Sequence, residues 1–452
     1  MATGDNGNLA PAQLLPGRRT GTQEGDPTKG AFFWLSAFFV VYCARPEDWI
    51  PGLVLLPLAK ITAILAMWGL FKSVGRTKRT LKDLPTEARL LITMIGLLLL
   101  GGFLSPVWRG GAVSRTLDFS KIFIAWALVF LLITTFDRLR RIIFVQAVSV
   151  VVICAAALIK GRGVERLEGV IGGIYSNPND LAFAIVLSLP FALAFLVTAK
   201  SAVVKFAWFL GMLVMLVAIF ETASRAGFID LVISFSVTLY YFAIKGKRMY
   251  LIVATVFLGG LVMVTAGGTL YARFEALSGN STTEKSAYGS YEDRMFLMGR
   301  AIDAMESYPI LGIGVQNFPK YSLIWHDVHM TYMQVGAEGG IPVLVIYLLF
   351  FRKAFQNLKV LRKRTDLAPD IVLFIGALTS SLVGFVVGAL FAPEAYQYFP
   401  YFAVAFTATL LQTIKEQDKE GANPVTPPPK RGRHFLEVYA DHGGPVAVSP
   451  VR

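Results

Sequence analysis

Two histidines three positions apart are the side chains best suited to chemistry. The segment 325–334 holds His326 and His329, whereas the other two of the four histidines lie near the C-terminus. With Asp327 between them the pair resembles part of a metal site, but apart from the two histidines of the C-terminal tail no further His or Cys lies outside the apolar segments to complete one. A histidine at a membrane–water boundary can instead accept a proton or donate to an oxyanion near neutral pH. We therefore predict no metal and no cofactor, and a plain interfacial histidine stays the alternative to a catalytic one.

Three arginines are candidates for binding an anion. Arg225 lies in a short turn between two apolar segments, where a guanidinium is costly unless it is paired. Glu221, one helical turn away, is its natural partner in an ion pair, whereas the planar guanidinium also suits a phosphate. Arg294 and Arg166 lie in other segments that connect apolar stretches, and they extend the list of candidates.

Residues 290–307 are predicted to form an amphipathic helix on the membrane surface. Ser290 and Asp293 have the spacing of a capping box, which would put Arg294 in the first turn of the helix. Four apolar residues recur at helical spacing and are expected to form its packed face: Met295, Met298, Ile302 and Met305. The glycines in the following stretch, 311–318, are too loosely spaced for a phosphate-binding loop.

Composition identifies the class of protein. Of the 452 residues, 55% are hydrophobic and 16% are charged, and the mean hydropathy is +0.57. A soluble domain carries about 25% charged residues, so soluble, disordered, fibrous and disulfide-scaffold proteins are excluded. The two cysteines, Cys43 and Cys154, each lie inside an apolar run and read as buried side chains rather than a disulfide. The chain is predicted to be an all-α polytopic membrane protein.

About twelve transmembrane helices fit the apolar runs, since a span needs roughly 20 apolar residues. The twelve segments are 31–44, 52–71, 90–108, 121–136, 142–159, 181–199, 204–221, 226–244, 250–266, 338–351, 371–391 and 398–414. Spans one to nine thus occupy 31–266, a long loop occupies 267–329, and spans ten to twelve occupy 330–414. The ends, 1–30 and 415–452, are predicted to be disordered tails.

The distribution of Lys and Arg predicts the orientation. Loops after even-numbered spans hold 20 of these residues, and the short loops after odd-numbered spans hold 8. Cytoplasmic loops collect Lys and Arg, so the even-span loops and both termini are assigned to the cytoplasm. The net charge of +13 then needs no nucleic-acid partner. The long loop faces outward, which in a bacterium with two membranes is the periplasm.

Three motifs resemble the O-antigen ligase and polymerase superfamily of bacterial envelope enzymes. They are Ser224-Arg-Ala-Gly227, Tyr308-Pro-Ile-Leu-Gly-Ile-Gly-Val-Gln-Asn-Phe318, and His329 leading to Ala337-Glu-Gly-Gly-Ile-Pro342. The long outward loop has the placement seen in that family, so the resemblance covers most of residues 30–415. A further motif, Tyr42-Cys-Ala-Arg-Pro-Glu-Asp-Trp49, looks like the branch called exosortase-associated O-glycosylation ligases.

The resemblance implies transfer of a glycan from a polyprenyl diphosphate carrier to an acceptor hydroxyl, without metal, at the outer face of a bacterial inner membrane. His329 and Arg225 correspond to the catalytic histidine and arginine of the family. The acceptor would be lipid A core or a protein. Met330 departs from the polar residue that usually follows the histidine, and Val343 stands where a small residue is common, which leaves the identity of the acceptor open.

A diphosphate leaving group gains negative charge as the bond to the sugar breaks. Without a metal ion, positively charged side chains must stabilise that charge. One charge pair at 4 Å contributes about 4 kcal/mol at an effective dielectric constant near 20, so two or three arginines are expected. Arg225, Arg294 and Arg166 are the candidates for binding the diphosphate. His329 would accept the proton of the attacking hydroxyl, and direct displacement inverts the anomeric centre. Tyr332, one turn onward, is a candidate for the acceptor site.

Two rival functions remain open. A lipid-linked glycan transporter would place charges near the membrane midplane, where Lys60 and Asp230 are the only candidates. A glycan polymerase of the same superfamily would share the donor chemistry and differ in its acceptor. In each case the partners are a lipid-linked glycan and membrane lipids.

Overall fold

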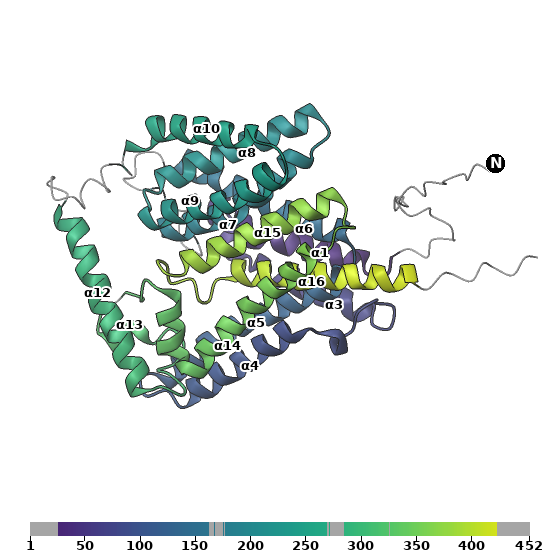
Figure 1. Ribbon diagram of the computed structural model, residues 1–452. Coiled ribbons are helices and arrows are strands. Elements are labelled where there is room, and N and C mark those ends of the chain that lie inside the picture. The colour runs from purple at the N-terminus through teal and green to yellow at the C-terminus, as the bar shows by residue number, and fades with distance from the viewer. Residues whose placement is uncertain are drawn as a thin grey trace, which may run out of the picture. The chain divides into compact units, whose positions relative to one another are not determined.

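The computed structural model describes residues 26–161, 167, 175, 177–268, 271, 284–324 and 326–422, without the side chains of 266, 284–292 and 422. The described residues form helices and no strand. The helices are α1 (Lys29–Ala44), α2 (Pro46–Trp49), η1 (Leu53–Leu55), α3 (Leu58–Lys72), η2 (Leu81–Asp83), α4 (Thr86–Phe103), α5 (Arg109–Leu132), α6 (Phe136–Lys160), α7 (Pro178–Thr198), α8 (Ala202–Glu221), α9 (Arg225–Leu239), η4 (Tyr240–Lys245), α10 (Tyr250–Ala266), α12 (Glu284–Ser307), α13 (Phe318–Ser322), α14 (Thr331–Arg362), α15 (Pro369–Gly388) and α16 (Tyr398–Ala422) (Figure 1).

Each of the twelve predicted spans coincides over most of its length with one of these helices. In the described part of the chain, seven helical segments are long and apolar enough to cross a membrane, namely α4, α6, α7, α8, α9 with η4, α14 and α15. The helices α1 and α10 are apolar but shorter. The chain is therefore an all-α, multi-pass membrane protein.

Two predicted loop boundaries were wrong. The segment 109–120 was assigned to an outward loop, but α5 begins at Arg109, so Arg115 and Lys121 belong to a helix of 24 residues. The C-terminal tail was placed from residue 415, but α16 continues to Ala422. Its last turns are rich in Lys, Glu and Gln, which are good helix formers.

The segments that connect consecutive helices contact one another at the two ends of the helix bundle. Such an arrangement is expected when consecutive spans cross the membrane in alternating directions. At one end Arg79 donates to the backbone oxygens of Phe130 and Ile133, both at 2.8 Å. At the same end Arg140 lies 3.2 Å from Asp370. These residues come from the loops with the most Lys and Arg, which are predicted to be cytoplasmic.

The loops predicted to face outward meet at the other end. The Asn317 side chain donates to the Ser105 hydroxyl at 2.9 Å, and Ser105 donates to the Ile313 oxygen at 2.6 Å. The Lys160 ammonium donates to the Trp49 oxygen.

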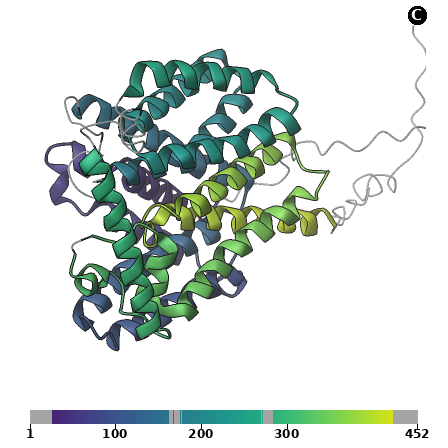
Figure 2. The same ribbon diagram turned by 60° about the vertical axis from the view of Figure 1, so that its left-hand side comes forward.

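The core lies around α7 and α15. Most of α7 is buried, and α15 packs against both α7 and α9. On the other side α14 packs against α4 and α12 (Figure 2). This arrangement brings the start of α14, which follows His329, close to the end of α15.

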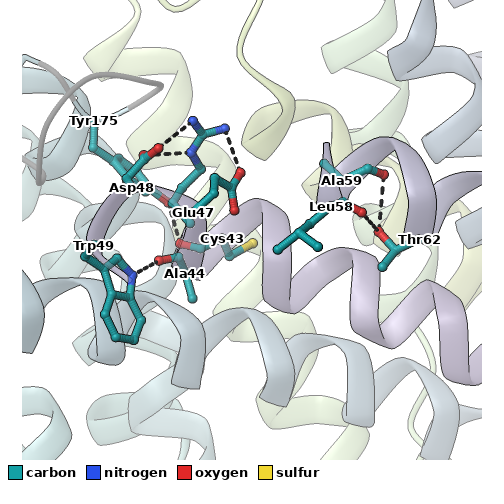
Figure 3. A network of polar contacts seen from close by, with 10 residues as sticks. Cys43, Ala44, Glu47, Asp48, Trp49, Leu58, Ala59, Thr62 and Tyr175 are labelled. Carbon is teal, nitrogen blue, oxygen red and sulfur yellow. Dashed lines mark hydrogen bonds and ion pairs between the residues drawn. The ribbon is translucent and has the colours of Figure 1, made fainter. Parts of the chain in front are cut away.

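The motif between α1 and α2 is a capped turn, shown in Figure 3. Arg45 has a left-handed backbone (φ 48°) and binds both oxygens of Asp48, at 2.8 and 2.9 Å. It also lies 3.3 Å from Glu47, and the Trp49 ring nitrogen donates to the Ala44 oxygen at 2.8 Å. These contacts give the Arg45–Trp49 motif a structural role at the end of α1.

Candidate active site

His329 lies two residues before α14 and is half-buried. Its position is fixed by Thr331, whose backbone N–H donates to the Ala389 oxygen at 2.8 Å and whose hydroxyl donates to the Ala392 oxygen at 2.6 Å. The same hydroxyl accepts a bond of 2.9 Å from the backbone N–H of Glu394. The loop after α15 therefore holds the chain in place just beyond the imidazole.

Arg294 is the charged side chain that acts on His329 from α12. Burial, the Arg294 charge and the His326 charge together lower the pKa of His329 to about 4. The imidazole is consequently neutral at physiological pH, which a proton acceptor requires. His326, three residues away, is exposed.

The helix that carries Arg294 differs from its predicted form. It begins at Glu284, so Ser290 lies inside it rather than capping it, and Arg294 is not in the first turn. Its packed face consists of Leu297, Ala301 and Ala304, which join a cluster with Ile313, Phe318, Val328 and Ala337. Of the predicted apolar face, Met295 and Ile302 are exposed and Met305 is partly buried. The stripe was misplaced because small alanines, not the methionines, allow close approach to the neighbouring segments.

Arg225 is the first residue of α9, and its position is set by the turn before it. Ala223 has a left-handed backbone (φ 48°), and the Ser224 hydroxyl caps α9 by accepting from the Gly227 N–H at 3.0 Å. Ser224 also donates to the Asn179 side-chain oxygen at 2.7 Å. Arg225 is half-buried, and its expected ion-pair partner Glu221 is exposed.

A series of polar contacts links the start of α9 to the start of α14. Asn179 precedes Asp180 in the first turn of α7, and the carboxyl group of Glu394 lies close enough to Asp180 for the Asp180 charge to raise its pKa. Glu394 in turn binds the Thr331 hydroxyl through its backbone. The turn of Arg225 and the segment of His329 are therefore positioned by one network.

Sequence reasoning did not connect the acidic side chains of this region with one another. Burial, followed by the charge of Asp180, raises the pKa of Glu394 well above its usual value. Burial also raises the pKa of Asp327, although His326 opposes the shift. The available signal was an acidic residue at the end of a predicted span, as Asp180 and Glu394 both are.

Glu338 holds the glycine-containing stretch against α14. Its buried carboxylate accepts from the Tyr396 hydroxyl at 2.6 Å and from the Phe318 N–H at 3.4 Å. Gly312 has φ +64°, and a Cβ there would lie 2.4 Å from the Glu338 carbonyl carbon. This glycine allows close backbone contact, which explains its presence without a phosphate-binding role. At Gly340 (φ 81°) α14 is kinked.

The remaining candidates are placed as follows. Tyr332 is half-buried, and its hydroxyl donates to the Val386 oxygen on α15 at 2.8 Å. Arg166 lies outside the described residues. Asp230 is buried in α9, and no hydrogen-bond partner is found among the described residues for either carboxylate oxygen. Within the described ranges, no three His, Cys, Asp or Glu residues are grouped so that they could hold a metal ion.

Residues 210–348 match the family model described as O-antigen ligase. The matched range includes Arg225, Arg294 and His329, and it confirms the resemblance to the O-antigen ligase superfamily. No curated protein matches the chain. Together with the apolar helices, the match supports a multi-pass bacterial membrane protein of the glycan-transferring type.

Proposed function

We propose that this protein is a glycan ligase that transfers an oligosaccharide or polysaccharide from a polyprenyl diphosphate carrier to an acceptor hydroxyl. The acceptor is lipid A core or a protein, and the reaction takes place at the periplasmic face of the inner membrane. The observation that carries the proposal is that His329, half-buried just before α14, has its pKa lowered by burial and by the charge of Arg294 within the segment that matches O-antigen ligases.

The chemistry follows from these two side chains. Neutral His329 accepts the proton of the acceptor hydroxyl as its oxygen attacks the anomeric carbon, and the bond to the diphosphate breaks with inversion. Arg294 and Arg225 bind the departing diphosphate, and Arg166 is a third candidate. Arginine suits this task because its guanidinium offers paired donors to phosphate oxygens. The residues named supply both the proton acceptor and the positive charge, so the proposed reaction uses neither metal nor cofactor.

A bound diphosphate also tunes the histidine. Part of the depression of the His329 pKa comes from the positive charge of Arg294. A dianionic group on Arg294 offsets that charge, so His329 becomes a stronger proton acceptor once the donor is bound. Binding of the donor thereby makes His329 a better proton acceptor for the attacking hydroxyl.

Substitution of His329 tests the proposal. In His329→Ala, transfer to the acceptor per unit of membrane-inserted protein should fall to background, because the proton acceptor is lost. His326→Ala is the matched control and should retain substantial activity, since its side chain is exposed. Normal specific activity in His329→Ala would refute the assignment. A polymerase of the same superfamily would instead elongate a carrier-linked glycan in the same assay.

A further inference from the structure

A groove lies at the end of the molecule that is predicted to be cytoplasmic, between α6, α7 and α8, which pack against one another (Figure 1). Its cavity volume is about 340 Å³. Its lining comes from three helices: Asp137, Arg140, Arg141 and Phe144 of α6, Phe195 of α7 with the adjacent Ala199, and Val204 and Trp208 of α8.

The groove has an aromatic floor. The ring of Phe195 stacks on Trp208 at a centroid distance of 5.0 Å, and Phe144 meets each of them edge-on at 5.5 Å. Phe144 is still partly exposed, and Phe206 on the same stretch of α8 is exposed as well. Apolar side chains that border a polar opening at a membrane interface are suited to the glycerol and upper acyl region of a lipid.

The rim is positively charged. Arg140 is held in place by Asp370 at 3.2 Å and by the Thr198 hydroxyl at 3.1 Å. Arg141 is exposed, and within the described part of the chain it has no hydrogen-bond or ion-pair partner. Lys200 precedes α8 and Lys205 lies between the lining residues Val204 and Trp208, and both lysines are exposed. Asp137 also lies on the rim and opposes an anion, and Asp370 pairs with Arg140. The four basic residues outnumber these two acidic residues, so the rim keeps a positive charge.

We propose that this groove binds the phosphate headgroup of an acidic phospholipid, with Arg141 as its principal contact. Basic pockets between transmembrane helices on the cytoplasmic side are suited to anionic headgroups. The aromatic floor favours a lipid over a free phosphate. A small ion would contact only the basic rim, whereas the glycerol and acyl part of a lipid would also cover the three rings. The site is independent of the proposed glycan transfer, since none of its residues belongs to the network around His329.

Native mass spectrometry of the detergent-purified full chain tests the proposal. The probes are phosphatidylglycerol, phosphatidylcholine with the same acyl chains, and inorganic phosphate. Wild-type protein should retain phosphatidylglycerol over phosphatidylcholine, and Arg141→Ala should lower that retention about fivefold. Arg141→Lys should restore much of it, because a lysine keeps the charge.

The control is Lys359→Ala, which removes the same charge from an exposed position in the last turn of α14. It should leave lipid retention unchanged. Equal retention of both lipids, or an equal loss in Lys359→Ala, would overturn the proposal. Binding of inorganic phosphate that depends on Arg141, without a preference between the lipids, would also overturn it, because the site would then be a phosphate site.

Discussion

The Ser224 hydroxyl donates a hydrogen bond of 2.7 Å to the side-chain oxygen of Asn179, and so joins the start of α9 to the start of α7. The same hydroxyl accepts from the Gly227 N–H. Both hydrogen-bonding functions of one serine are therefore used, one inside its own helix and one between helices. Arg225 follows directly, so its direction depends on both bonds.

Ser224→Ala should remove the cap and the link together. Loss of an N-cap costs about 1 kcal/mol, and loss of the link frees the turn that carries Arg225. Transfer per unit of protein should therefore fall several-fold while the protein still inserts. Ser236→Ala is the control, because the Ser236 hydroxyl binds only the Val232 oxygen on the exposed part of the same helix. Equal activity in the two variants would contradict a role of Ser224 in positioning.

The pH profile should reveal the depressed pKa of His329. The neutral form is required, and burial and Arg294 lower its pKa to about 4. The value of kcat/KM should therefore stay level as the pH falls through 6.5, the ordinary histidine pKa, and decline only near pH 4. The sign follows from the direction of the shift, because a lowered pKa keeps the imidazole unprotonated at lower pH.

Removal of the Arg294 charge should shift the acid limb of the pH profile, which is the decline of kcat/KM at low pH, to a higher pH. In Arg294→Gln the pKa of His329 should rise, so residual activity should decline at a higher pH than in the wild-type protein. Arg300→Gln is the control on the same helix, since Arg300 pairs with Asp303 at 3.1 Å instead. An acid limb that stays in place in Arg294→Gln would show that Arg294 does not act on the histidine during turnover.

Arg225 should be sensitive to geometry as well as to charge. Arg225→Lys keeps the charge but loses the paired donors, so transfer should be impaired; Arg225→Ala should lose on the order of a hundredfold. The ion-pair alternative gives a different result, in which Arg225→Ala and Glu221→Ala lower protein abundance equally. Transfer and abundance measured together for both variants distinguish the two. Glu221 is exposed, and we expect Glu221→Ala to be close to wild type.

Reporter fusions should establish the orientation. A reporter fused after Lys247, which lies in the turn after η4, should be cytoplasmic, and one inserted near Asn280 should be periplasmic. The contacts Arg79–Phe130 and Arg140–Asp370 already place the basic loops at a common end. The opposite result from both reporters would put His329 on the cytoplasmic side and remove the basis for a periplasmic reaction.

The sequence predicted most of the helices, because a run of apolar residues both requires a bilayer and specifies a helix. It failed where polar residues continue a helix, as in α5 from Arg109 and α12 from Glu284. There the capping signal at Ser290 was outweighed by a longer stretch of residues compatible with a helix. Local propensity is a weak guide when tertiary packing selects the face that is buried.

The candidate site could be predicted only in part. His329 and Arg225 were proposed from short motifs, and Arg294 was proposed as a further cation that binds the diphosphate. The electrostatic interaction between Asp180 and Glu394 joins segments far apart in the sequence, and no local spacing predicts such an interaction. The hydrogen bonds of Glu338 could not be predicted for the same reason, because its partners Tyr396 and Phe318 lie in two other parts of the sequence.

Glu338 and Tyr396 provide the last prediction. Their bond of 2.6 Å lies in the interior, so Glu338→Ala leaves the Tyr396 hydroxyl and the Phe318 N–H without an acceptor. Each unsatisfied buried group costs about 1–3 kcal/mol, and we expect a lower thermal midpoint and little transfer. Glu338→Gln retains one oxygen acceptor and should be milder.

A double-mutant cycle separates this bond from general packing. Tyr396→Phe removes the hydroxyl of this contact, and Glu338→Gln leaves one acceptor oxygen for the two donors, so the double variant should be less destabilised than the sum of the single variants, by about 0.5–3 kcal/mol. Tyr332→Phe combined with Glu338→Gln is the control, because Tyr332 binds the Val386 oxygen instead, and their effects should add. The measurement is the free energy of unfolding of the detergent-solubilised protein. Additive effects of Glu338→Gln and Tyr396→Phe would show that the bond between Glu338 and Tyr396 does not contribute to stability.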